Sequence, residues 1–306
     1  MSATPDPAAP IRRLTVGDIA KLYADGQRIP MLTAYDYPTA KLVDEAGVPL
    51  ILVGDSLGRV MLGYENEIPV SMTDMLHHTA AVTRGARRAF VIGDMPFLSY
   101  PTPDAAVVNA GRFLSEAGAQ AVKVEGGVRS ARTIETIVRA GIPLMGHIGW
   151  TPQAANQAGR VRVLGKTRDQ ARGLLADALA VQEAGAFAIV LELVPDQLAR
   201  AITQRLRIPT IGIGAGPGCS GQVQVITDLL GMDAWRPKHA RAYADLRGSI
   251  LAATRAYASD VEAGTFPGAG ETVRMDDEIL AEVLGRSAMD TAGEIPLEGI
   301  PLDRDL

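Results

Sequence analysis

The sequence predicts an α/β fold, a (β/α)8 TIM barrel, and two observations support this prediction. Eight short runs rich in Ile, Val and Leu lie between residues 29 and 227, and they mostly lack polar alternation. Parallel strands that are covered on both faces have this composition. Helix-like segments that end at a glycine separate the runs, as expected for repeated βαβ units.

The elements follow one another regularly along the chain. Strands are expected at 29–33, 50–54, 89–93, 121–125, 143–146, 188–192, 209–212 and 222–227. Helices are expected between them at 37–46, 73–84 (capped by Thr73), 102–118, 130–140, 167–184 and 195–206. Three further helices are expected at 14–24, covering the bottom of the barrel, at 240–263, closing it, and at 275–284.

An open doubly wound sheet is the alternative architecture. The last unit is irregular, because only about ten residues separate the seventh and eighth strands, too few for a crossover helix. We expect residues 1–268 to form a single barrel domain with an N-terminal extension. Residues 269–306 are acidic and rich in glycine, and 293–306 should be a mobile tail.

Composition excludes several classes of protein. The 306 residues carry a net charge of −5, and only 5% are aromatic, which argues against nucleic acid or an anionic membrane as a partner. No apolar run approaches the roughly 20 residues of a membrane span, and residues 1–10 do not resemble a signal peptide. The single cysteine, Cys219, suits a reducing compartment. We therefore expect a cytoplasmic protein that acts on small molecules.

Four of the apolar runs end on a carboxylate, where a purely structural strand would not place one. These residues are Asp55, Asp94, Glu125 and Glu192. All strands of a barrel end at the same face, so the four side chains should converge there. Unpaired carboxylates are costly in apolar surroundings, which favours a shared divalent cation. Oxygen ligands suit Mg²⁺, and the chain lacks the cysteines and close His pairs of zinc sites.

Helix capping is the alternative explanation for an aspartate at the end of a strand. Asp55 precedes Ser56, Leu57 and Gly58, which fit a loop better than a cap. Glu192 lies between two leucines, where capping does not explain it. Lys123 should lie on the same side of its strand as Glu125, because alternate residues face the same way. A lysine inside a barrel needs an anion, either a carboxylate or an oxygen of the substrate.

Two further features stay open at this stage. His147 follows the fifth strand and could contact substrate, cofactor or a water molecule, or serve only the structure. The run 212–218 is rich in glycine, but Pro217 stands where a dinucleotide-binding loop needs its third glycine. We expect a flexible loop at the barrel mouth there rather than a phosphate-binding loop.

Several stretches in fixed order closely resemble the ketopantoate hydroxymethyltransferase family. They are Leu32-Thr33-Ala34-Tyr35-Asp36-Tyr37, Leu52-Val53-Gly54-Asp55-Ser56-Leu57-Gly58, Asp94-Met95-Pro96-Phe97, Val122-Lys123-Val124-Glu125-Gly126-Gly127, Gly146-His147-Ile148-Gly149-Trp150-Thr151-Pro152-Gln153 and Ile211-Gly212-Ile213-Gly214-Ala215-Gly216. The resemblance runs from about residue 14 to 268. It implies a barrel of the phosphoenolpyruvate/pyruvate type and a homodecamer built as a pentamer of dimers.

The resemblance also implies an activity. Such enzymes transfer a hydroxymethyl group from 5,10-methylenetetrahydrofolate to 3-methyl-2-oxobutanoate, giving 2-dehydropantoate on the route to pantothenate and coenzyme A. The residues that match an Mg²⁺ site are Asp55, Asp94 and Glu125. Those that match oxo-acid contacts are Asp55, Ser56, Asp94 and Lys123. Glu192 matches the proton acceptor, and His147 is a possible cofactor contact.

The chain departs from the family pattern at Asn66-Glu67 and in the loop around Gly159, both expected at the barrel mouth. Mg²⁺-dependent lyases and mutases share this type of barrel and are the competing enzyme class. They typically carry a catalytic cysteine in a Lys-Lys-Cys-Gly-His type of loop, which the sequence lacks. A non-enzymatic barrel that serves as an oligomeric scaffold or a binding module is a further alternative. It would require that the carboxylates of the site have no catalytic role.

Overall fold

A computed structural model describes residues 12–284 of the chain. Residues 1–11 and the predicted mobile tail at 293–306 lie outside the described residues. Contacts between Cα atoms divide the chain into two compact units, Met1–Arg247 and Gly248–Leu306. The predicted domain boundary at residue 268 stays a prediction, and the two units are described separately.

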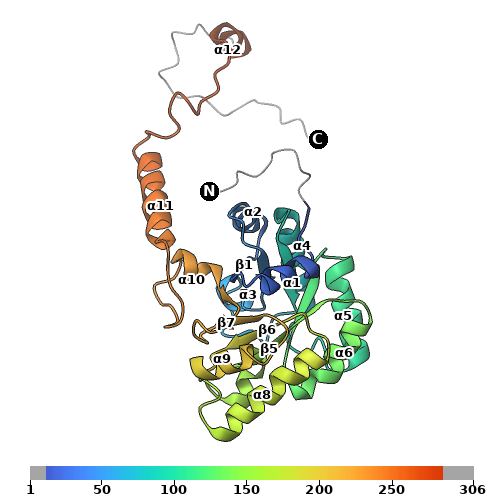
Figure 1. The fold of residues 1–306 in the computed structure, drawn as a ribbon. Coiled ribbons are helices and arrows are strands. Elements are labelled where there is room, and N and C mark those ends of the chain that lie inside the picture. Colours follow the sequence, from blue (N-terminus) through green and yellow to red (C-terminus); the bar gives the residue numbers. More distant parts are fainter. Residues whose placement is uncertain (1–11, 285–306) are drawn as a thin grey trace. The chain divides into compact units, whose positions relative to one another are not determined.

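The first unit is built on eight parallel strands that close into a barrel in the order β1 to β8 (Figure 1). The strands are β1 (Ile29–Thr33), β2 (Leu50–Val53), β3 (Phe90–Asp94), β4 (Ala121–Glu125), β5 (Leu144–Gly149), β6 (Ala188–Glu192), β7 (Thr210–Ile213) and β8 (Gly221–Gln224). Pairing of β1 with β8, with Met31 opposite Val223, closes the ring. The barrel prediction is confirmed, and the open sheet is excluded.

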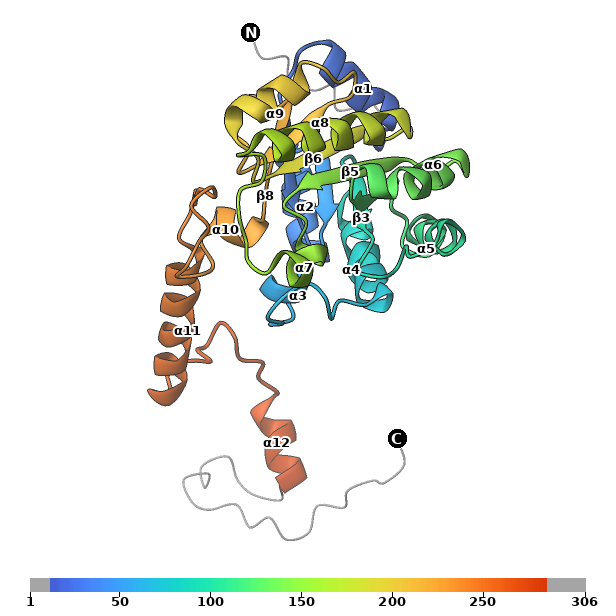
Figure 2. The same cartoon turned by 90° about the horizontal axis from the view of Figure 1, so that it is seen from below.

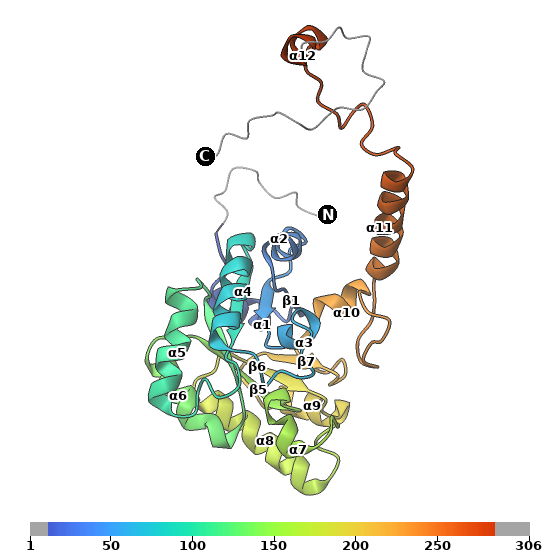
Figure 3. The ribbon, with the colours of Figure 1, turned by 180° about the vertical axis from the view of Figure 1, so that it is seen from behind.

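Helices surround the strands, and Figures 2 and 3 show α4, α5, α6 and α8 on the outside of the barrel. The helices of this unit are α1 (Val16–Ala24), α2 (Tyr37–Glu45), α3 (Leu57–Val60), α4 (Met72–Gly85), α5 (Pro103–Ser115), α6 (Ala131–Arg139), α7 (Ala155–Ala158), α8 (Arg168–Glu183), α9 (Asp196–Thr203) and α10 (Ile226–Leu230). Two 3₁₀ turns, Val128–Ser130 and Pro152–Ala154, follow β4 and β5.

Local sequence signals explain where most helices begin. The side chains of Thr15, Asp36, Ser71, Thr102 and Thr167 accept hydrogen bonds from the first turns of their helices. The expected cap of α4 at Thr73 is wrong, because Ser71 and Asp74 form a reciprocal capping box two residues earlier.

The core has two layers. A cluster inside the barrel joins residues near the starts of the strands, such as Ile29, Leu50 and Phe90, and it includes Ile19 of α1. Helix α1 therefore covers the bottom of the barrel, as predicted. A larger cluster fills the space between strands and helices. The two ends of the barrel interior therefore differ in polarity. The end near the strand starts is apolar, and the end near the strand C-termini carries polar side chains.

The expectation that 240–263 closes the barrel stays a prediction, because most of this segment lies in the second unit. Helix α11 (Leu246–Glu262) belongs to the second unit, and each of its residues is exposed or half-exposed, including the apolar Ile250 and Tyr257. The short helix α10 follows β8 and contributes the buried Ile226 to the core. The second unit also contains α12 (Asp277–Leu284). Among the described residues, no helix is long and apolar enough to cross a membrane.

Gly149, the last residue of β5, should tolerate no side chain. Its φ is +96°, and a Cβ there would lie 2.1 Å from the carbonyl oxygen of Glu192. That oxygen already accepts a hydrogen bond from the Trp150 amide. We expect Gly149→Ala to lower the free energy of unfolding by about 3 kcal/mol, combining overpacking with backbone strain.

Urea denaturation measures this loss. The matched control is Gly173→Ala in the interior of α8, where a Cβ meets nothing within 4 Å and the change should raise stability by about 0.5–1 kcal/mol. Equal stability of the wild type and Gly149→Ala would contradict the packing described for the end of β5.

Candidate active site

The predicted acidic residues converge at the C-terminal mouth of the barrel. Asp55 is the second residue after β2, and Asp94, Glu125 and Glu192 are the last residues of β3, β4 and β6. The first three are buried, and the side chain of Glu192 is 19% exposed. Within residues 12–284 none of the four caps a helix, so the capping explanation is excluded.

Lys123 and Asp94 form a buried ion pair at the centre of this group. The Lys123 Nζ lies 2.8 Å from Asp94 Oδ1, and both side chains are at most 4% exposed. The other carboxylate oxygen of Asp94 accepts a hydrogen bond of 3.1 Å from the backbone N–H of Asp55. Strands β3 and β4 therefore hold the lysine against the carboxylate, as the sequence predicts for a cation inside a barrel.

Gln153 connects three of the loops at the mouth. Its side-chain amide donates to Asp55 Oδ2 at 2.8 Å and to the carbonyl of Met95 at 2.9 Å. Its backbone N–H donates to Glu125 Oε2 at 3.2 Å. Tyr100 donates its hydroxyl hydrogen to the Gln153 side chain. Gln153 thus fixes the orientation of two candidate cation ligands, Asp55 through its side chain and Glu125 through its backbone N–H.

His147 lies between Glu192 on one side and Lys123 and Glu125 on the other. Its Nδ1 is 3.2 Å from Lys123 Nζ and 3.4 Å from Glu125 Oε1, and its Nε2 is 3.2 Å from Glu192 Oε2. Burial and Lys123 lower the pKa of His147, while contacts with Glu125 and Glu192 raise it, to about 9 in net. The imidazole is 3% exposed. A direct contact of His147 with a cofactor stays a prediction.

Backbone geometry fixes the position of Glu192. The next residue, Leu193, has a φ of +49°, which is rare for a residue other than glycine. Leu193 is held on both sides by hydrogen bonds, from its own N–H to the Ile213 carbonyl and from the Leu164 N–H to its carbonyl. Strain of this kind persists where the surrounding structure enforces it, commonly at functional sites.

The charges of the site do not balance. Asp55, Asp94 and Glu125 are three buried carboxylates, and Lys123 alone is a permanent cation among them. Burial and Asp55 raise the pKa of Asp94 well above its usual range, although Lys123 opposes this shift. Burial lowers the pKa of Lys123, but Asp94 and the other carboxylates outweigh it and raise the value in net. The lysine is therefore charged, and the site favours additional positive charge.

Two buried carboxylate oxygens of the site face cationic neighbours: Asp94 Oδ1 lies 2.8 Å from Lys123 Nζ, and Glu125 Oε1 lies 3.4 Å from His147 Nδ1. Lys123 and His147 together do not offset the carboxylates gathered here, so the excess negative charge favours a further cation. In the described part of the chain, no three His, Cys, Asp or Glu side chains are grouped closely enough to hold a metal ion as they stand. The donor set is oxygen-rich and suits a hard cation, with the ligands brought together on binding.

Sequence reasoning missed several polar residues of the mouth. Gln153 and Tyr100 come from loops, and only the motif that contains Gln153 pointed to it. Ser56 was predicted, and its hydroxyl lies 2.9 Å from the Tyr35 hydroxyl. Residues 214–218 of the glycine-rich run lie in the loop between β7 and β8, as predicted, while 212 and 213 end β7. The loop is tightly packed, since a Cβ on Gly216 would lie 2.6 Å from Asp196.

Glu67 is an additional buried carboxyl group at the mouth. Burial is the main reason why its pKa rises to about 7, and repulsion by Asp55 adds to it, while Arg59, 3.9 Å away, opposes it. The folded protein therefore holds this proton more tightly than the unfolded chain. Folding stability should fall as the pH rises from about 4.5 to 7, and the full cost should be present above pH 7.

Glu67→Gln should remove this cost. In metal-free protein we expect the variant to gain roughly 2 kcal/mol in unfolding free energy at pH 8 and several-fold less at pH 5. Chemical denaturation at both pH values measures the gain. Glu65→Gln, at an exposed position two residues earlier, should leave stability unchanged. An equal gain at pH 5 and pH 8 would rule out a perturbed Glu67 carboxyl.

Comparison with known proteins identifies the family. The model of the ketopantoate hydroxymethyltransferase family matches residues 13–269. The chain belongs to the ketopantoate hydroxymethyltransferase family. A relative from Chloroflexus aurantiacus named 3-methyl-2-oxobutanoate hydroxymethyltransferase is 62% identical over 274 residues, covering 89% of this chain and 97% of its own. One of the same name from Dehalococcoides mccartyi is 53% identical over 273 residues, covering 89% and 98%.

Solved structures similar to this member of the ketopantoate hydroxymethyltransferase family include a phosphonopyruvate hydrolase complex with oxalate and Mg²⁺. Its TM-score is 0.56 at 14% identity, with 89% of this chain and 95% of that chain covered. A 2,3-dimethylmalate lyase of the PEP mutase/isocitrate lyase superfamily has a TM-score of 0.54 at 16% identity, covering 88% and 94%. These likenesses concern the fold, and they agree with the predicted phosphoenolpyruvate/pyruvate type of barrel.

Proposed function

We propose that the protein transfers a hydroxymethyl group from 5,10-methylenetetrahydrofolate to 3-methyl-2-oxobutanoate. With one water molecule consumed, the products are 2-dehydropantoate and tetrahydrofolate, and the reaction belongs to pantothenate and coenzyme A biosynthesis. Membership of the family is the main support. The observation in the molecule that carries the proposal is the meeting of Lys123, His147 and the strand-end carboxylates at one barrel mouth.

Asp55, Asp94 and Glu125 are the residues that would hold Mg²⁺. Their negative charge exceeds the positive charge of Lys123, and every ligand atom they offer is a carboxylate oxygen, so the residues fit a hard divalent cation. When bound, Mg²⁺ supplies Lewis-acid stabilisation of negative charge on the oxygens of a 2-oxo acid.

The remaining site residues bind substrate and move one proton. Lys123 donates hydrogen bonds to the keto and carboxylate oxygens of the oxo acid, and it stabilises the negative charge that develops on the keto oxygen. Glu192 removes the proton from C3, and this carbon then attacks the one-carbon unit of the folate. His147 lies 3.2 Å from Glu192 and fixes that carboxylate in place, while Ser56 contacts the substrate from the loop after β2.

A turnover assay tests the proposal. Purified protein should consume 3-methyl-2-oxobutanoate only when 5,10-methylenetetrahydrofolate is present, and EDTA should abolish the reaction until Mg²⁺ is restored. Turnover of phosphonopyruvate or 2,3-dimethylmalate without folate would instead indicate the lyase and mutase class. Calorimetry with Mg²⁺ and the oxo acid separates either enzyme from a non-enzymatic scaffold, because a scaffold would bind neither the cation nor the acid. The decameric assembly and the cytoplasmic location stay predictions.

A further inference from the structure

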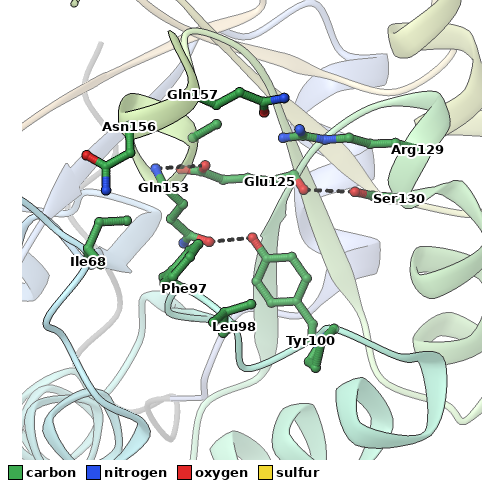
Figure 4. Close-up of a pocket in the computed structure, with 12 residues that line it drawn as sticks. Ile68, Phe97, Leu98, Tyr100, Glu125, Arg129, Ser130, Gln153, Asn156 and Gln157 are labelled. Atoms are coloured by element: carbon green, nitrogen blue, oxygen red, sulfur yellow. Dashed lines mark hydrogen bonds between the residues drawn. The ribbon is translucent and has the colours of Figure 1, made fainter. Parts of the chain in front are cut away.

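A cavity adjoins the acidic site and shares Tyr100, Glu125 and Gln153 with it. The cavity has a volume of about 310 Å³ and reaches Glu125 and Gln153 at its inner end (Figure 4). Its outer part is formed by the loop after β3, the turn after β4 and helix α7. The oxo-acid contacts proposed above lie on the acidic side, so this cavity is free for a second ligand.

One wall of the cavity is apolar and exposed. Phe97 is 37% and Leu98 is 67% exposed, although both lie next to the buried strand β3. Leu98 has a φ of +58°, one of two such residues other than glycine in the described part of the chain. The turn is fixed on both sides, because Ser99 N–H donates to the Pro96 carbonyl and Asn109 donates to the Ser99 carbonyl.

A strained backbone that keeps two apolar side chains in solvent costs stability, and such strain collects at ligand-binding loops. The other strained residue, Leu193, positions Glu192 of the proposed site. We read the pair Phe97 and Leu98 as a platform for a flat ring, since aromatic groups gain from burial against such a surface.

The opposite wall is polar and carries a free cation. Figure 4 shows the guanidinium of Arg129 and the amide of Gln157 on the side of the cavity away from Phe97 and Leu98. Among residues 12–284, the Arg129 side chain makes no ion pair or hydrogen bond, and Asn156 and Gln157 likewise have unused amide groups. Arginine binds carboxylates through two parallel hydrogen bonds, so its partner should be a carboxylate of the ligand.

We infer that this cavity binds the aminobenzoyl-glutamate half of the folate, with the aromatic ring on Phe97 and Leu98 and a glutamate carboxylate on Arg129. The inference rests on the proposed function. It places the reactive methylene, which joins the pterin to the aminobenzoyl nitrogen, at the inner end beside Glu125 and Gln153. The amide groups of Asn156 and Gln157 then serve the amide link between ring and glutamate.

Fragment binding tests the inference without turnover. The metal-loaded protein should bind p-aminobenzoyl-L-glutamate in calorimetry more tightly than p-aminobenzamide, which keeps the ring and the amide but has no carboxylate for Arg129. Arg129→Gln should remove this preference and raise KM for 5,10-methylenetetrahydrofolate about tenfold or more, as expected for loss of a charge-assisted hydrogen bond. KM for 3-methyl-2-oxobutanoate should stay unchanged. Leu98→Gly should weaken the binding of both fragments.

Arg132→Gln is the matched control, because Arg132 is exposed on α6 and does not line the cavity. It should change none of these values. Equal binding of both fragments to wild type and Arg129→Gln would overturn the inference while leaving the proposed reaction intact. Fragment binding that depends on Arg129 in a protein without turnover would instead overturn the proposed reaction and keep the cavity assignment.

Discussion

Glu192→Gln should lower kcat by roughly 10² to 10⁴-fold, the range that a positioned general base contributes. The amide keeps the shape of the side chain but cannot accept the C3 proton. Binding of 3-methyl-2-oxobutanoate and Mg²⁺ should persist, because neither involves this carboxylate. Proton NMR in D₂O measures the step directly: wild type should exchange the C3 hydrogen of the oxo acid for deuterium, and the variant should not.

Glu192→Asp and Glu135→Gln serve as controls. The aspartate keeps a carboxylate that is one methylene shorter, so exchange should be slower than in wild type yet measurable. Glu135 is an exposed residue of α6, and its replacement should leave exchange unchanged. Deuterium exchange at the wild-type rate in Glu192→Gln would remove Glu192 from the role of base.

Asp94→Asn should weaken Mg²⁺ binding and oxo-acid binding together. The amide oxygen can still accept the hydrogen bond from the Asp55 N–H, so the change removes chiefly the negative charge. Lys123 then loses its 2.8 Å partner, and it repels a cation that the remaining carboxylates attract less strongly. We expect Mg²⁺ affinity to fall about 100-fold or more, a loss of the size that accompanies disruption of a metal-ligand shell.

Calorimetric titration with Mg²⁺, and then with 3-methyl-2-oxobutanoate, measures both affinities. Asp104→Asn, on the exposed first turn of α5, is the control and should change neither. Loss of oxo-acid binding with unchanged Mg²⁺ affinity would show that Asp94 acts only through Lys123. Unchanged affinity for both ligands would exclude Asp94 from the site.

The strand ends of the site could be predicted from the sequence because barrel topology alone brings them together. Asp55, Asp94, Glu125 and Glu192 need no knowledge of loop geometry to converge, since all parallel strands of a barrel end at one face. The position of Lys123 beside Glu125 could be predicted because alternate residues of a strand face the same side. The same reasoning located the apolar bottom of the barrel and its cover by α1.

Loops and the last helix could not be predicted in the same way. Gln153 and Tyr100 reach the site through turns whose course depends on tertiary contacts, and Glu67 is buried by packing that no local pattern reveals. Helix α11 has the length and composition of a closing helix, but helical periodicity does not specify what a helix packs against. Its predicted role therefore stays a prediction, although the helix itself lies close to the expected residues.

The hydrogen bonds of Gln153 have a consequence for how ligands enter. Gln153 links the ends of β2 and β3 through its side-chain amide and the end of β4 through its backbone N–H, so these loops cannot rearrange independently. A cation that takes Asp55 Oδ2 as a ligand competes with the Gln153 amide for the same oxygen. The same side chain accepts the hydrogen bond from Tyr100, which lines the neighbouring cavity, so a shift of the Gln153 amide on cation binding would also change that wall of the cavity.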